Sequence, residues 1–250
     1  LFVGAFIGTT AAGIYAAGSR FLLFAIYVAD ALIQVISPRL AGLLAAKRHT
    51  EASKVLTTAT GWQVLLVWPA FLVVFTYASV LLGFLGDEFD VAEPALRWLA
   101  AAALVAALNG PSVSVILMGG RSGVALANTA VAFTVNIVGN VVLVPAYGIA
   151  GAGATWAATI IVASSLPAIE SRTLFDVQPW GRSIARAALL ATGTMGAACV
   201  AGRMILGDTV VALGVSALTG TALYVALLLR HAEEYGLNQL ITRPAPSRQA

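Results

Sequence analysis

Long blocks of apolar residues recur along the chain, each separated from the next by a short polar stretch. A block of about 20 apolar residues crosses about 30 Å of hydrocarbon as an α-helix. The residues are 60% hydrophobic and only 10% charged. So few charges cannot cover the surface of a water-soluble fold. The blocks show no alternation of polar and apolar residues, so a barrel with a polar lumen is not expected. We therefore predict an all-α integral membrane protein, a polytopic helix bundle.

The apolar blocks predict seven complete transmembrane helices. Residues 1–7 are apolar but too short to cross a bilayer, so they are expected to be the stump of a further helix. The stretch 42–60 is expected to form either a short amphipathic helix on the membrane surface or a solvated loop. The predicted spans are Ala11–Ile36, Trp62–Leu85, Ala95–Met118, Val124–Val144, Ile149–Ile169, Ile184–Leu206 and Val210–Leu229.

Charged residues between these spans alternate in sign from one connection to the next. Four acidic residues, Asp87, Glu88, Asp90 and Glu93, follow the second span, whereas basic residues follow the first, third, fifth and seventh. Eleven of the 14 Lys and Arg residues thus lie on one side, the exceptions being Arg20, Arg97 and Arg203. The positive-inside rule makes that side cytoplasmic, together with the polar tail 233–250. The net charge of +3 is therefore interpreted as a result of membrane topology and not as a sign of an anionic partner. No nucleic-acid partner is expected.

Arg20 is predicted to lie near the middle of the membrane, because it is about nine residues inside the first span. A guanidinium keeps its charge there, so it requires a watery cavity or a partner. Its planar fork suits the binding of phosphate. The alternative is that the helix begins later and Arg20 extends outward to the headgroups.

Five more polar side chains in the spans are candidates for function. Asp30 and Gln34 lie one turn apart, where they either couple transport to an ion or mark an interfacial helix end. Asn136 and Asn140 share one stripe of the fourth span, where amides either line a polar path or join helices. Asn109 has the same two interpretations, and nearby Pro111 is expected to kink its helix.

Sequence motifs for catalysis or metal binding are missing. His49 and His231 have no acid or cysteine cluster at ligand spacing, and Cys199 is the only cysteine. The sequence contains no Walker A motif. We therefore expect no catalytic residues, no metal and no cofactor, and a protein that is not an enzyme.

Two strings resemble polysaccharide and oligosaccharide-lipid flippases of the multidrug/oligosaccharidyl-lipid/polysaccharide exporter superfamily. The first is Gly13-Ile-Tyr-Ala-Ala-Gly-Ser-Arg20 with the following Pro38-Arg-Leu-Ala41, and it resembles the start of the family's second lobe. The second and more specific string runs from Asn136 to Ala152, an Asn-containing helix that ends in Pro, Tyr and Gly. Together they cover roughly the first 170 residues.

The resemblance implies the C-terminal half of a two-lobe exporter. Residues 1–170 would form the second lobe, from a truncated helix seven to helix twelve, and residues 171–232 two extra helices. An N-terminal lobe of the same protein would be the partner. By alternating access, the lobes would flip an undecaprenyl-pyrophosphate-linked oligosaccharide across a bacterial cytoplasmic membrane for polysaccharide export, with Arg20 as the phosphate ligand.

Two other functions are compatible with the sequence. A cation-coupled multidrug exporter of the same superfamily needs a titratable acid within the membrane, and Asp30 is the candidate. A membrane-embedded polysaccharide polymerase or ligase needs polar residues in a sizeable outer loop. The longest outer connection, residues 86–93, is acidic and contains no His.

Overall fold

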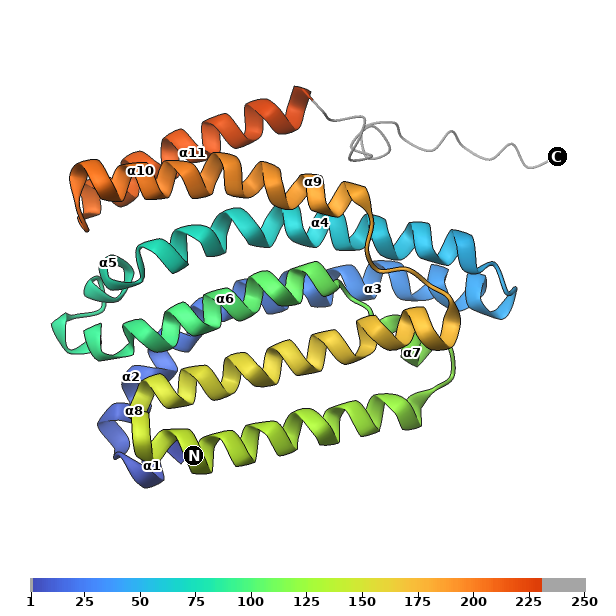
Figure 1. Cartoon of the computed structure of the whole chain (residues 1–250), viewed down its shortest axis with the longest axis horizontal. Coiled ribbons are helices and arrows are strands. Elements are labelled where there is room, and N and C mark those ends of the chain that lie inside the picture. The colour runs from blue at the N-terminus through green and yellow to red at the C-terminus, as the bar shows by residue number, and fades with distance from the viewer. Residues whose placement is uncertain (1, 231–250) are drawn as a thin grey trace.

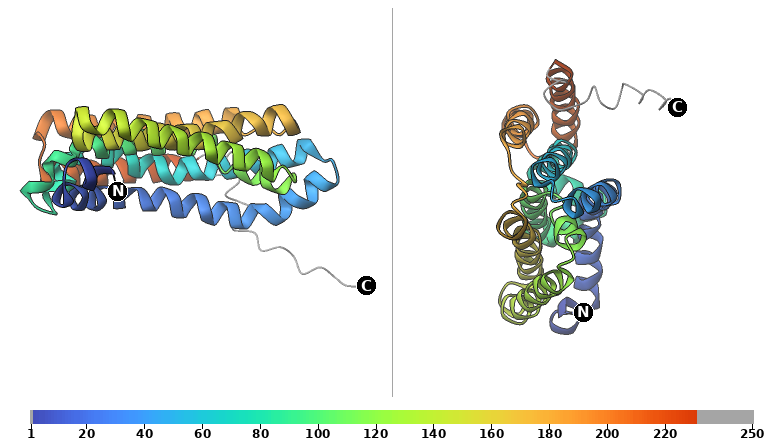
Figure 2. Two further views of the ribbon diagram at one scale, coloured as in Figure 1. Left: turned by 90° about the horizontal axis from the view of Figure 1, so that it is seen from below. Right: turned by 90° about the vertical axis from the view of Figure 1, so that its right-hand side faces the viewer.

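The computed structural model describes residues 2–230, which form a bundle whose long helices run along one common direction (Figures 1 and 2). No strand occurs among these residues. Six of the helical segments are long and apolar enough to cross a membrane. The prediction of an all-α helix bundle is confirmed, and the six apolar helices are consistent with a multi-pass membrane protein. The predicted tail 233–250 lies outside the described residues.

The helices follow one another with short connections. In order they are α1 Phe2–Phe6, α2 Thr9–Ser19, the 3₁₀ turn η1 Arg20–Leu22, α3 Leu23–Ala45, α4 His49–Thr76, α5 Ala78–Gly83, η2 Asp87–Ala92, α6 Glu93–Asn109, α7 Val113–Met118, α8 Ser122–Phe175, α9 Arg182–Ala191, the π-helical turn η3 Thr192–Gly196, α10 Ala197–Leu206 and α11 Val210–Arg230.

Helix α8 folds back on itself at Gly148 (Figure 1). Gly148 has φ 59° and ψ −133°, a conformation that only glycine adopts without strain. The chain therefore forms two antiparallel limbs, residues 122–147 and residues 149–175, here called the first and second limbs. The turn coincides with the connection predicted between the fourth and fifth spans.

Several helix boundaries differ from the predicted spans. Residues 42–60 form neither a surface helix nor a loop, because α3 extends to Ala45 and α4 begins at His49 and continues into the bundle. The third span is interrupted between α6 and α7, where Gly110 has φ 61° and Pro111 has no N–H to continue the helix. The first span is longer than predicted, since helical structure continues from Thr9 to Ala45.

Helix α4 is at the centre of the packing. The largest buried cluster combines side chains of α4 and α6 with those of α9 and α11, including Phe71, Leu99 and Ile184. Two hydrogen bonds join α4 to its neighbours. Trp68 Nε1 of α4 donates to the Leu104 carbonyl of α6 at 3.0 Å, and the Tyr224 hydroxyl of α11 donates to the Leu65 carbonyl of α4 at 2.8 Å. The two C-terminal spans therefore share a core with the rest of the bundle.

The connections rich in basic residues and the connections rich in acidic residues lie at opposite ends of the bundle. The connections that carry Arg48, Arg121 and Arg182 meet at one end, here called the basic end (Figure 1). Residues 87–93, the Gly148 turn and the α10–α11 connection meet at the other, the acidic end. Two of the exceptional arginines pair there with acids, Arg97 with Glu93 at 2.6 Å and Arg203 with Asp208 at 2.9 Å.

Candidate binding cavity

A cavity of about 650 Å³ lies between α1, α2 and both limbs of α8. This volume is within the range of about 300–1,000 Å³ that is usual for small-molecule sites. Helix α2 contributes small residues to its wall, and the two limbs contribute most of its polar groups. The lining residues are Phe2, Val3, Ala12, Tyr15, Ala16, Ser19, Asn136, Asn140, Ala152, Trp156 and Thr159.

The two amides of the first limb are fixed toward the cavity by hydrogen bonds. Asn136 Nδ2 donates to Thr159 Oγ1 at 3.2 Å across the two limbs. Asn140 Nδ2 donates to the carbonyl oxygen of Asn136 at 2.7 Å and to its Oδ1 at 3.2 Å. Within the described chain no donor reaches Asn140 Oδ1. That oxygen can therefore accept a hydrogen bond from a ligand or from water.

The limbs approach closely enough for this arrangement because of a glycine. A Cβ at Gly139 would lie 2.7 Å from Thr155 Cγ2, so only glycine fits against the second limb there. The rings of Tyr15 from α2 and Trp156 from the second limb also line the cavity, with their centroids 6.1 Å apart. The cavity thus combines amide groups with two amphipathic aromatic rings.

Of the residues predicted from the sequence, Asn136 and Asn140 line this cavity. Asn109 does not, because it is buried between α6 and the second limb, where its Nδ2 donates to Ser164 Oγ and Ser165 Oγ at 3.1 and 2.9 Å. Asp30 and Gln34 also lie elsewhere, on an exposed face of α3. The structure therefore does not bring the predicted substrate and ion residues into one site.

Arg20 lies in η1, directly after α2. Gly18 packs against Leu82 and Ala92, which border the acidic connection, so this part of the chain lies near the acidic end. Helix α3 alone has 23 residues, enough to cross the hydrocarbon. Arg20 is exposed and directly follows Ser19, a cavity-lining residue, but does not itself line the cavity.

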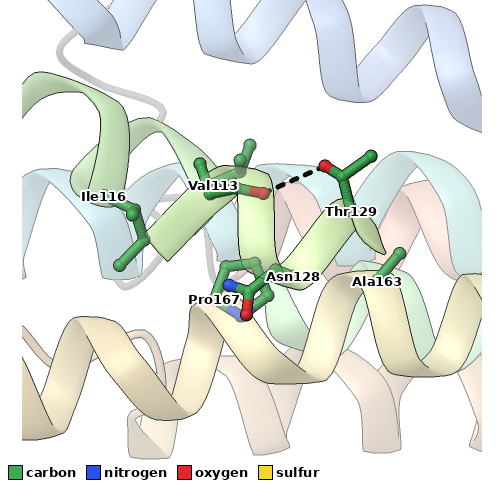
Figure 3. A pocket seen from close by; sticks show the side chains of 7 residues that line it. Val113, Ile116, Asn128, Thr129, Ala163 and Pro167 are labelled. Atoms are coloured by element: carbon green, nitrogen blue, oxygen red, sulfur yellow. Dashed lines mark hydrogen bonds between the residues drawn. The ribbon is translucent and has the colours of Figure 1, made fainter. Parts of the chain in front are cut away.

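A second, smaller cavity of about 60 Å³ lies between α7 and the two limbs, near the basic end (Figure 3). Asn128 of the first limb and Pro167 of the second limb both line it (Figure 3). Asn128 Nδ2 donates to Glu170 Oε2. The pairing of Asn128 with Glu170 is not evident from the sequence, because 42 residues separate the two. Within residues 2–230 no group of three or more His, Cys, Asp or Glu residues is arranged to hold a metal ion.

Comparisons with models of protein families, with curated proteins and with solved structures find no match to this chain. The candidate cavity therefore has to be interpreted from its own chemistry.

Proposed function

We propose that this chain belongs to a membrane transporter whose substrate passes through the cavity between α2 and the limbs of α8. The observation that carries the proposal is the set of amide and hydroxyl groups that line that cavity within an apolar helical bundle. Amides, hydroxyls and aromatic rings at one site give hydrogen bonding together with an apolar surface, a combination found in ligand pockets. In a bilayer, such groups require either protein partners or water.

We propose in addition that the substrate is an undecaprenyl-pyrophosphate-linked oligosaccharide, flipped by alternating access. The sequence resemblance described above supports this substrate. Amides bind sugar hydroxyls as both donors and acceptors. Arg20 directly follows the cavity-lining residue Ser19, and we propose that its guanidinium binds the pyrophosphate at the edge of the cavity.

The charge distribution supports an orientation for this transporter. The basic end would face the cytoplasm of a bacterium, because positively charged connections remain on that side of the membrane. Substrate made in the cytoplasm would enter from the basic end and leave at the acidic end. An N-terminal lobe of the same protein is the proposed partner that completes the path.

Complementation tests the proposal. The chain, together with any sequence that its gene encodes upstream, is expressed in bacteria that lack a repeat-unit flippase, and surface glycan is measured. We expect restoration that is lost in the double variant Asn136→Ala/Asn140→Ala and weakened in Arg20→Ala. Thr134→Ala is the matched control, because Thr134 is exposed on the same limb and outside the cavity.

All variants are compared at equal abundance in the membrane. Full glycan export by the double variant would exclude this cavity as the substrate path. No restoration by the parent chain, together with resistance to drugs, would instead favour the multidrug exporter and its acid Asp30.

A further inference from the structure

The connection between α8 and α9, residues 176–181, is fixed to helix α4 at the basic end of the bundle (Figure 1). The Gln178 N–H donates to Ser53 Oγ at 3.0 Å, and Thr57 Oγ1 lies 3.0 Å from the Gln178 carbonyl oxygen. Gly181 lies against the same threonine, since a Cβ at Gly181 would be 3.0 Å from Thr57 Cγ2. The connection therefore has a defined position on α4.

This arrangement brings an exposed tryptophan together with two exposed cations. Trp180 lies in the connection, and Arg182 directly follows Gly181, which touches Thr57. Lys54 is three residues before Thr57, so the two share a side of α4. Among residues 2–230, neither cation has an acid within ion-pair distance. We call Lys54, Trp180 and Arg182 the Trp180 patch.

The acids closest in sequence do not neutralise the patch. Glu51 is one turn before Lys54, but its carboxylate is bound by Arg48 at 2.5 Å. Asp176 is the only acid in the stretch 172–186 and begins the connection, next to the end of α8, where its N–H donates to the Arg172 carbonyl at 3.2 Å. The Trp180 patch therefore keeps a net positive charge.

The exposed side of α9 changes from charged to apolar within two turns. Arg182 and Leu189 are both exposed, whereas Ile184 and Ala187 are buried in the core cluster that contains α4. Leu189 is seven residues after Arg182, about 10 Å further along the helix axis. A cationic end, an exposed tryptophan and an apolar flank match the headgroup, the interface and the acyl chains of a phospholipid. An acidic segment of a soluble protein would match the charges alone.

We propose that the Trp180 patch binds the headgroup of an anionic phospholipid. The Arg182 guanidinium and the Lys54 ammonium bind its phosphate oxygens, and the acyl chains lie along the side of α9 that carries Leu189. Each cation near a membrane surface strengthens binding of an anionic lipid about fivefold, so the two together give about 30-fold. A zwitterionic phospholipid gains less, because its own ammonium cancels the phosphate charge. The proposal does not depend on which substrate the larger cavity takes.

Native mass spectrometry of the full chain in detergent tests the patch by counting bound lipids. Phosphatidylglycerol and phosphatidylethanolamine with the same acyl chains are titrated separately. We expect one saturable site that prefers phosphatidylglycerol about 30-fold. Lys54→Gln and Arg182→Gln should each reduce this preference about fivefold, and the double variant should abolish it. Arg39→Gln is the matched control, because Arg39 is an exposed cation of α3, on the opposite side of the bundle from α9 (Figure 2).

Thermal stability gives a second readout. Phosphatidylglycerol should raise the melting temperature of the parent and of Arg39→Gln more than that of the double variant. Equal binding of the two lipids by the parent, or the same preference in the double variant as in Arg39→Gln, would overturn the proposal. Displacement of phosphatidylglycerol by inorganic phosphate or by poly-glutamate would also overturn it, in favour of a soluble anion or an acidic protein segment.

Discussion

Replacing Gly153 with Ala should separate two helices that the fold requires to touch. Gly153 lies in the second limb against α6, and a Cβ placed there would be 2.4 Å from Cα and 2.5 Å from Cβ of Ala95. Carbon atoms in contact are normally about 3.5–4.0 Å apart. The clash involves backbone, so no side-chain rotation relieves it and the helices must move apart by about 1 Å.

The cost of this movement follows from overpacking of buried sites, about 1–3 kcal/mol. For a chain of this size, each kcal/mol lowers the melting temperature by about 2–4 °C. We therefore expect Gly153→Ala to melt about 2–12 °C below the parent. Gly61→Ala is the matched control: a Cβ at Gly61, in the middle of α4, meets nothing within 4 Å. It should be neutral or slightly stabilising, because Ala is the better helix former.

The chain carries its own probe for this measurement. Cys199 is the only cysteine and is fully buried, so a thiol-reactive coumarin maleimide becomes fluorescent only as the bundle unfolds. Melting curves of the two variants and the parent are recorded in the same detergent. Equal melting temperatures for Gly153→Ala and Gly61→Ala would refute the close contact between the second limb and α6.

Three further substitutions test other contacts. Gly148→Ala places a non-glycine residue in the turn between the limbs and should lower the free energy of unfolding by about 1–3 kcal/mol. Its melting temperature should be lower than that of the control Gly193→Ala, because a Cβ at Gly193 meets nothing within 4 Å. The Tyr77 hydroxyl forms hydrogen bonds with Ser216 Oγ at 2.8 Å and with the Cys199 carbonyl at 3.2 Å, and Tyr77→Phe removes it. A double-mutant cycle with Ser216→Ala should give a coupling free energy of about 0.5–1.5 kcal/mol rather than zero. Asn109→Ala should lower stability by about 1 kcal/mol in denaturant titrations, because Ser164 and Ser165 lose their common donor.

Much of the fold follows from local sequence, because span length and the sign of the connecting charges are properties of short segments. The turn at Gly148 was predictable from its proline and glycine neighbours. The stripe of Asn136 and Asn140 follows from helical periodicity, and the structure places both amides in the cavity.

Other features depend on contacts between distant residues. The surroundings of Arg20 depend on how α2 packs against Leu82 and Ala92, which counting residues from Ala11 does not reveal. Asn109 is paired with serines 55 and 56 residues away, which periodicity does not reveal. Glu170 has the pattern of an ordinary charge at the end of a span until Asn128 is found beside it.

Water access to the larger cavity decides whether it can be a substrate path. In a Cys199→Ala background, Ala16→Cys and Ala158→Cys place one thiol each at exposed positions, the first in the cavity wall and the second outside it. Both are treated in native membranes with a polar maleimide supplied to both faces. A thiol reacts as its thiolate, which forms in water and not in lipid, so we predict labelling of Ala16→Cys at least about tenfold faster. Equal rates, or faster labelling of Ala158→Cys, would show that the cavity is not a watery path and would contradict the account.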